Sequence, residues 1–308
     1  MSRIGDAMKR AGAEQPEGGY QSLDGTAADA FRDVGGPPPA DAQAEPEAER
    51  RHEPGALTEL PVGLFEPYSD TIDEKVAIHA STPPVAREQY RRLAATLHHV
   101  QAERGIKTIL VASAMASEGK TLSAVNVALT LSESYRRRVL LIDADLRRPS
   151  VHEVLGFDNI VGLTDALASR DERRLPIIAV SPRLSVLPAG RPNADPMEAL
   201  TSSRMLKILD EASAVFDWVV IDTPPVGLLP DANLLAAMVD GAIFVVAANR
   251  TPFVAVSKAV EALGRDRILG VVLNRVEARD STPHDYYYKY YSQATPKRGP
   301  FGFASPSS

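Results

Sequence analysis

Short runs of consecutive apolar residues recur along the middle of the chain, separated by segments in which apolar residues follow helical spacing. Each run has four to six residues, the length of a strand that is buried on both faces. We predict strands over residues 108–112, 139–142, 218–221, 242–247 and 269–273. We predict helices over residues 85–100, 120–131 and 253–263. Buried strands that alternate with helices predict an α/β fold, a parallel β-sheet flanked by helices on both faces.

The first 78 residues have a different composition. Ala, Pro, Gly, Asp and Glu dominate there, and such a segment buries too little apolar surface to offset the entropy cost of ordering it. We therefore expect residues 1–78 to be a largely disordered N-terminal region, followed by a folded domain over 79–278 and a flexible, tyrosine-rich tail over 279–308. Near the start, four apolar residues follow helical spacing, which fits a short partner-docking helix and also a frayed terminus: Ile4, Ala7, Met8 and Ala11.

Composition narrows the class of protein. The formal net charge is −6 and the pI about 5.6, which argues against a nucleic-acid-binding protein. The chain has no cysteine, which excludes disulfides, thiolate metal sites and thiol nucleophiles. No stretch approaches the ~20 apolar residues that span a bilayer, and the N-terminus lacks the apolar core of a signal peptide. We expect a cytoplasmic protein that a partner recruits to the inner face of the membrane.

A candidate phosphate-binding loop follows the first predicted strand. The segment Ala112-Ser113-Ala114-Met115-Ala116-Ser117-Glu118-Gly119-Lys120-Thr121 leads into a predicted helix, and this strand–turn–helix context suits a loop whose N–H groups cradle phosphates. Lys120 would reach the β- and γ-phosphates and Thr121 would ligate Mg²⁺. Alone, Gly-Lys-Thr is common by chance, and Ala114 stands where the general motif has glycine. The residues predicted to line the nucleotide site are Ser113, Ala116, Ser117, Glu118, Gly119, Lys120, Thr121 and Leu122.

Carboxylates follow two further strands. Asp143 and Asp145 end the second strand, and Asp222 ends the third within Ile221-Asp222-Thr223-Pro224-Pro225. A single aspartate after a strand usually caps a helix or forms a turn. Here, however, the carboxyl ends of parallel strands bring three carboxylates to the sheet edge that also carries Lys120. This coincidence predicts a site for ATP and Mg²⁺, with Thr121, Asp145 and Asp222 as the metal residues.

With these motifs in order, residues 80 to 291 resemble the bacterial tyrosine kinases (BY-kinases), autokinases of capsule and exopolysaccharide biosynthesis within the MinD/ParA-like branch of P-loop NTPases. Three motifs support the resemblance: the modified Walker A loop, the second acidic motif Asp143-Ala144-Asp145-Leu146-Arg147-Arg148-Pro149, and the Walker B element at Asp222. The resemblance implies a tyrosine-protein kinase with Asp143 as candidate base for the tyrosine hydroxyl, Asp145 at the metal and Asp222 organising the metal's water. The catalytic set it implies is Lys120, Asp143, Asp145, Arg147 and Asp222.

A tyrosine cluster lies close to the C-terminus. Five of the chain's 9 tyrosines fall within seven residues. A β-prone aromatic segment or an interface strand is the simpler interpretation, but the cluster follows the last predicted strand and lies among Ser, Thr, Pro, Lys and Gly. The family carries such a cluster as its autophosphorylation site. The resemblance therefore implies the phosphate acceptors Tyr286, Tyr287, Tyr288, Tyr290 and Tyr291.

The same resemblance implies partners. They are a membrane-embedded polysaccharide chain-length or adaptor protein, a protein-tyrosine phosphatase, and further copies of the chain, bound through the tail and the helix that carries Glu88 and Arg91. The family's interface motif has a second arginine at the position of Ala94, and Glu88 with Arg91 is also the spacing of a solvated ion pair on one helix. After the fifth strand, Asn274 and Arg275 match a place where related ATPases contact adenine, although a strand-ending turn is the alternative.

Two other functions remain open. The first is a nucleotide-gated scaffold with little kinase activity, because Ala116-Ser117 replaces the family's Pro-Gly and serine reaches positive φ less readily than glycine. A MinD/ParA-like positioning ATPase is the other. Such ATPases carry a second lysine five residues before the loop lysine, where this chain has Met115, which counts against that function.

Overall fold

The computed structural model of the chain describes residue 76 and residues 82–169, 175–227 and 230–276. They belong to one of the two units into which the chain divides, Pro54–Ser308. The N-terminal helix considered above, both predicted domain boundaries and the tyrosine cluster lie outside the described residues, so these remain predictions.

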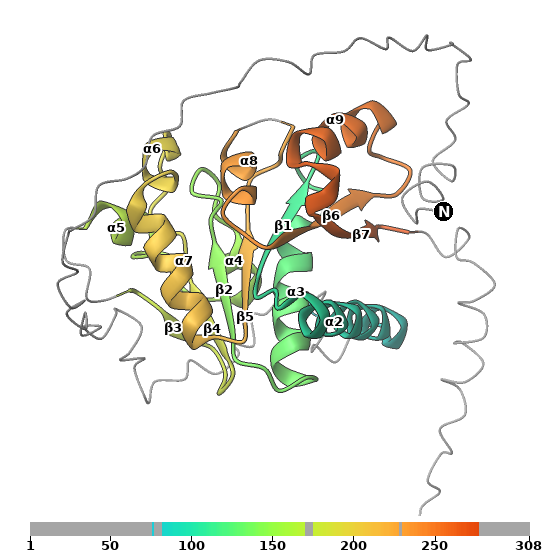
Figure 1. The fold of residues 1–308 in the computed structure, drawn as a ribbon, viewed down its shortest axis with the longest axis horizontal. Helices are drawn as coiled ribbons and strands as arrows, with labels where there is room; N and C mark the ends of the chain where they lie inside the picture. Colours follow the sequence, from blue (N-terminus) through green and yellow to red (C-terminus); the bar gives the residue numbers. More distant parts are fainter. Residues whose placement is uncertain (1–75, 77–81, 170–174, 228–229, 277–308) are drawn as a thin grey trace, which may run out of the picture. The chain divides into compact units, whose positions relative to one another are not determined.

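A seven-stranded sheet forms the centre of the fold, in the order β3-β4-β2-β5-β1-β6-β7 (Figure 1). All neighbouring strands pair in parallel except β3 with β4. The predicted parallel sheet with flanking helices is confirmed, and all five predicted strands are present. The strands are β1 (Thr108–Ser113), β2 (Val139–Asp143), β3 (Ile178–Ala179), β4 (Leu184–Leu187), β5 (Trp218–Asp222), β6 (Gly241–Ala247) and β7 (Ile268–Asn274).

The short strands β3, at one edge of the sheet, and β4, beside it, were not predicted. They contain two and four residues, too few for a clear periodic pattern. The three predicted helices are confirmed as α2, α3 and α9, whereas α7, of 13 residues, was not predicted. α2 begins at Pro84 and ends before Gly105, whose φ of 70° stops it. The helices are α2 (Pro84–Arg104), α3 (Lys120–Glu133), α4 (Val151–Leu155), α5 (Leu163–Ala168), α6 (Met197–Leu200), α7 (Ser203–Val215), α8 (Asp231–Ala236) and α9 (Phe253–Leu263), with a 3₁₀ turn at Arg265–Arg267.

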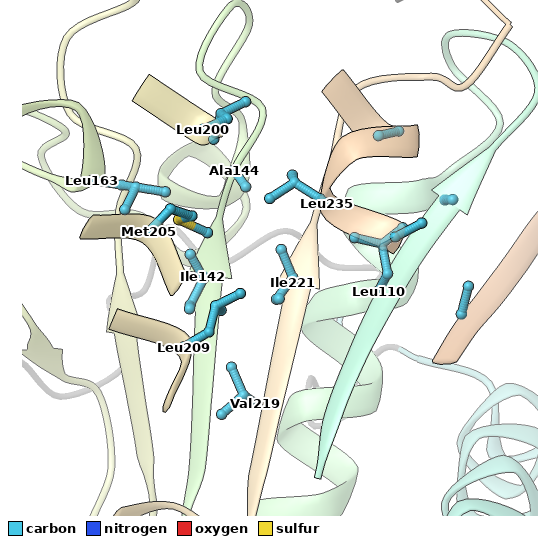
Figure 2. Close-up of a cluster of buried hydrophobic side chains, with 14 of the residues drawn as sticks. Leu110, Ile142, Ala144, Leu163, Leu200, Met205, Leu209, Val219, Ile221 and Leu235 are labelled. Atoms are coloured by element: carbon cyan, nitrogen blue, oxygen red, sulfur yellow. The ribbon is translucent and has the colours of Figure 1, made fainter. Parts of the chain in front are cut away.

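Both faces of the sheet are buried. Leu110, Ile142 and Ile221 point to one face, where α7 and α8 supply Met205, Leu209 and Leu235 (Figure 2). Alternate strand residues such as Ile109 and Leu141 pack on the opposite face against α2 and α3. This double burial is the physical reason why the strands are continuous apolar runs. None of the described helices combines the length and apolar character needed to cross a membrane.

The strand register positions the site. In the parallel pairing of β2 with β5, Asp143 lies opposite Asp222, and in the pairing of β5 with β1, Asp222 lies opposite Val111. The loop that follows β1 therefore starts beside the two aspartates, at the carboxyl edge of the sheet, where ligands bind in open α/β folds.

Candidate nucleotide-binding site

The loop between β1 and α3 has the backbone of a phosphate cradle. Ser117 has φ 63° and Gly119 φ 90°, and α3 begins directly afterwards at Lys120. A Cβ atom at Gly119 would lie 2.0 Å from Asn274 Nδ2, so glycine is required there by space as well as by φ. Ser117 holds its left-handed conformation without glycine, which costs about 1 kcal/mol.

Two residues from the end of β7 hold the loop from outside. Asn274 Nδ2 donates a hydrogen bond of 2.8 Å to the carbonyl oxygen of Glu118, and the Arg275 guanidinium donates one of 2.6 Å to that of Ser117. Asn274 and Arg275 are therefore in contact with the predicted loop rather than only ending a strand.

A buried carboxylate supports the loop from within. The Glu118 side chain accepts a hydrogen bond of 2.6 Å from Met115 N–H and another from the hydroxyl of Thr251, after β6. Ala247 N–H lies between the two, 3.2 Å from the Thr251 hydroxyl and 3.4 Å from Glu118. The sequence analysis identified Glu118 as part of the loop but missed Thr251, because no local signal in the sequence connects residues 133 positions apart.

Lys120 joins the loop to the acidic strand ends. Its ammonium nitrogen lies 2.6 Å from Asp222 Oδ1 and 3.9 Å from Asp145 Oδ2. Thr121 donates a hydrogen bond of 2.7 Å to the other oxygen of Asp222 and lies 2.9 Å from the Ser150 hydroxyl. Four predicted site residues thus meet at one point, and Ser150 is a fifth that the sequence analysis missed.

Asp143 lies beneath this group and is 1% exposed. Its carboxylate accepts hydrogen bonds from the N–H groups of Asp145, Ser150 and Val151, at 3.2, 3.1 and 3.0 Å. Burial, followed by the charge of Asp222, raises the pKa of Asp143 to about 7. Burial likewise raises the pKa of Asp145. Two neighbouring carboxyls therefore hold protons more readily than exposed ones do.

Arg147 turns toward a different partner. It forms an ion pair of 2.8 Å with Asp231, a buried residue at the start of α8, and donates to the carbonyl oxygen of Ala194. The hydrogen bond to Asp231 raises the pKa of Arg147. These contacts tie the segment after β2 to α8, and the catalytic role of Arg147 stays a prediction.

The other residues predicted to line the nucleotide site lie in the loop and at the start of α3. Ser113 donates a hydrogen bond of 2.9 Å to the carbonyl oxygen of Met115. Ala116 is exposed at the loop, and Leu122 is half-buried on α3, against the core shared with α2.

The oxygen donors present fit Mg²⁺. Thr121, Asp145 and Asp222 supply hard hydroxyl and carboxylate oxygens around Lys120. Within the described residues no three carboxylate or histidine side chains converge as a metal cage. Mg²⁺ does not need one, because it is held in proteins by one or two carboxylates together with water and substrate phosphates.

Comparison with known proteins identifies the family. Residues 109–295 match the CobQ/CobB/MinD/ParA nucleotide-binding domain family. Over 203 residues the chain is 34% identical to the tyrosine-protein kinase YwqD of Bacillus subtilis (strain 168), which covers 65% of this chain and 85% of that protein. The chain belongs to the bacterial tyrosine-protein kinases. The nucleotide-binding loop and the carboxylates above are therefore parts of a BY-kinase domain.

Two further comparisons agree. The kinase domain of the Escherichia coli tyrosine kinase ETK superposes with a TM-score of 0.59 at 31% identity, over 64% of this chain and 78% of that one. The succinoglycan biosynthesis transport protein ExoP of Rhizobium meliloti (strain 1021) is 33% identical over 180 residues, 56% of this chain but 23% of ExoP. A segment similar to this chain thus forms one part of a longer transport protein.

Replacing Ser117 by glycine tests the strain in the loop. Because glycine adopts positive φ freely, we expect Ser117→Gly to raise the rate of phosphotyrosine formation about two- to fivefold. Ser117→Val, which places a β-branched residue at positive φ, is expected to lower it. Initial rates at saturating ATP provide the measurement, and an unchanged or slower glycine variant would show that the loop is adapted to serine.

Removing the Thr251 hydroxyl tests the support of the loop by Glu118. Thr251→Val leaves one oxygen of the buried Glu118 carboxylate with only the long contact of 3.4 Å to Ala247 N–H, and an under-satisfied buried acceptor costs about 1–3 kcal/mol. We expect ATP affinity to fall about tenfold, whereas Thr251→Ser, which keeps the hydroxyl, retains it. Equilibrium nucleotide binding at matched thermal stability is the measurement. Equal affinities of the Val and Ser variants would contradict the prediction.

Proposed function

We propose that the chain is an ATP-dependent tyrosine autokinase that transfers the γ-phosphate of ATP to the tyrosines of its own C-terminal cluster. The observation that carries the proposal is the meeting of Lys120 and Thr121 with Asp222 and Asp145 at the carboxyl edge of the sheet. Cation, hydroxyl and carboxylates at one point are the parts that an Mg-nucleotide site requires.

Lys120 would neutralise charge on the β- and γ-phosphates, while the N–H groups at the start of α3 bind phosphate oxygens. Thr121, Asp145 and Asp222 would hold Mg²⁺, which supplies further positive charge to those oxygens. Asn274 and Arg275, which hydrogen-bond to the loop from the end of β7, would contact the nucleotide's base.

Asp143 would act on the acceptor. As the tyrosine oxygen bonds to the γ-phosphorus and the β–γ bridging oxygen leaves with ADP, the phenolic proton passes to a carboxylate. A carboxyl whose pKa is about 7 can hold that proton near neutral pH. Its three N–H donors fix its orientation.

The biological setting is polysaccharide assembly. We propose that phosphorylation of the tail regulates exopolysaccharide or capsule polymerisation and export, in the cytoplasm beside a membrane-embedded adaptor. The occurrence of a related domain within a transport protein, ExoP, supports this setting. A protein-tyrosine phosphatase would reset the tail. Glu88 and Arg91 pair on α2 at 3.8 Å, and self-association through this helix is part of the proposal.

A nucleotide-gated scaffold is the second candidate. It is favoured by the strained conformation of Ser117, which would slow turnover while still allowing nucleotide binding. A MinD/ParA-like positioning ATPase has less support, because Met115 stands at the position of the second lysine.

Mixing one inactive chain with one chain that lacks the tail tyrosines tests the kinase proposal. One chain carries Lys120→Met; the other has Phe at all five tail tyrosines. When the two chains are incubated together with Mg-ATP, we expect phosphate on the tail of the Lys120→Met chain, because the other chain supplies the active site. Lys120→Met alone is expected to lose about 10²-fold or more in rate, since a positioned charge is removed.

Lys258→Met, at an exposed lysine on α9, is the matched control and should keep full activity. Mass spectrometry locates the phosphate. Modification mainly at Tyr20, Tyr68, Tyr90 or Tyr135, or on no chain in the mixture, would remove the trans-autokinase proposal.

Asp143 and Asp145 are expected to differ in their dependence on Mg²⁺. Asp145→Asn removes the negative charge of a proposed Mg²⁺ ligand. The Mg²⁺ concentration that gives half of the maximal ATP binding should therefore rise about tenfold. Asp143→Asn should leave that concentration nearly unchanged while slowing transfer. Titration of Mg²⁺ against ATP affinity measures both, and coincident curves would remove the division of roles.

A further inference from the structure

Ser150 lies between a proposed metal residue and the proposed base. Its hydroxyl oxygen is 2.9 Å from the Thr121 hydroxyl oxygen, and its N–H donates a hydrogen bond of 3.1 Å to Asp143. The side chain and the backbone of one residue therefore contact two different functional groups. No sequence motif connects the two hydroxyls, because Thr121 and Ser150 are 29 positions apart.

Capping of α4 is the ordinary role for a serine at this position. Ser150 directly precedes α4, where a serine hydroxyl usually accepts a hydrogen bond from an N–H group of the first turn. Within the described residues the Ser150 side chain makes no such bond. The Asp143 carboxylate accepts from the N–H groups of Ser150 and Val151 instead, at 3.1 and 3.0 Å. The start of the helix is thus satisfied without the Ser150 hydroxyl.

The residues on either side of Ser150 contribute to a different surface. Arg148 and His152 belong to the lining of an open pocket of about 530 Å³, together with Phe157 and Ile160. The Ser150 hydroxyl contacts Thr121 instead. Its contact is therefore with the group around Lys120, to which Thr121 belongs.

The direction of the hydrogen bond between the two hydroxyls follows from the number of protons. Thr121 has a single hydroxyl proton, which it donates to Asp222 at 2.7 Å. The hydrogen bond of 2.9 Å must therefore run from Ser150 to Thr121. It occupies one of the two lone pairs of the Thr121 oxygen. The second lone pair is left with a long contact of 3.4 Å to the Lys120 ammonium nitrogen.

We propose that Ser150 is a positioning residue for the metal: its hydroxyl holds the Thr121 oxygen so that one lone pair stays available to Mg²⁺. This role rests on the proposed kinase function, because it concerns the metal of that site. The hydrogen bonds with Asp222 and Ser150 fix a hydroxyl that would otherwise rotate between staggered positions. Loss of a partner that orients a metal ligand typically lowers metal affinity about 10- to 100-fold.

The surroundings of the two hydroxyls set the size of the effect. Asp222 is fully buried, and Lys120 is 7% exposed, so the Thr121 hydroxyl is held against groups that water hardly reaches. Thr121 and Ser150 are themselves half-buried, so water can replace part of the hydrogen bond between them. We therefore expect a loss of metal affinity at the lower end of that range.

Nucleotide binding by the full-length chain tests the role of Ser150. The probe is a non-hydrolysable ATP analogue, whose binding is measured at increasing Mg²⁺ and, separately, in EDTA. We expect Ser150→Ala to raise the Mg²⁺ concentration that gives half of the maximal binding about tenfold. Its affinity for the analogue in EDTA should change less than about twofold, because the contacts of Lys120 with phosphate do not involve Ser150.

Two further substitutions grade the same hydroxyl. Ser150→Thr keeps the donor and should reproduce the wild-type Mg²⁺ curve. Ser150→Cys supplies a thiol, a weaker donor, and should shift the curve by an intermediate amount. This series keeps the test available even if the alanine variant is unstable.

Ser202→Ala is the matched control. Ser202 precedes α7, and its hydroxyl does cap that helix, accepting a hydrogen bond of 3.3 Å from Met205 N–H. Its replacement should lower the melting temperature by about 2–4 °C and leave the Mg²⁺ curve unchanged. The control thereby separates a loss of stability from a loss of metal binding.

A shifted Mg²⁺ curve in Ser150→Ala supports the role of Ser150 even if no tyrosine is phosphorylated, in which case only the proposed kinase function fails. Coincident curves for Ser150→Ala and the wild-type chain overturn the role, and phosphate transfer would then leave the kinase function standing. An equal loss of affinity with and without Mg²⁺ also overturns it, because Ser150 would then shape the nucleotide site as a whole. Tighter Mg²⁺ binding in Ser150→Ala overturns it as well, since the hydroxyl would then compete with the metal.

Discussion

The contact between Lys120 and Asp222 is the interaction on which the rest of the site depends. Asp222 is fully buried at the end of a central strand, and a buried carboxylate requires a paired charge and hydrogen bonds. Lys120 and Thr121 satisfy both of its oxygens at 2.6 and 2.7 Å. The loop after β1 must therefore close over β5, and this closure brings Asp145 and Ser150 to the same point.

The loop is stabilised mainly by surrounding side chains. Glycine-rich phosphate loops reach positive φ without strain, whereas Ser117 here is held in that region by contacts from β7 and from the turn after β6. Thr251, in the turn after β6, and Asn274 and Arg275, at the end of β7, supply hydrogen bonds from two segments that are distant in sequence. The shape of the loop is consequently coupled to the end of β7, the strand from which the tyrosine-bearing tail continues.

The segment after β2 contributes residues both to the acidic group around Lys120 and to the lining of the open pocket. Its aspartates face Lys120, while its following residues, from Arg148 to Phe157, line the open pocket. Arg147 links this segment to α8 through buried Asp231. A single turn, in which Arg148 N–H donates a hydrogen bond of 3.1 Å to Asp145, therefore joins the proposed metal residues to the wall of the open pocket.

The sequence by itself determined the parallel sheet, its five main strands and the strand ends that carry the acidic residues, because double burial produces apolar runs that can be read locally. The motif spacing identified Lys120, Thr121, Asp143, Asp145 and Asp222 as one candidate group. Only the tertiary structure decided that Thr251 and Asn274 support the loop, that Asp231 pairs with Arg147, and that Arg148 and Ile160 share a pocket. These contacts join residues far apart in the chain through strand order and register, and pairwise distances of that kind leave no periodic pattern in the sequence.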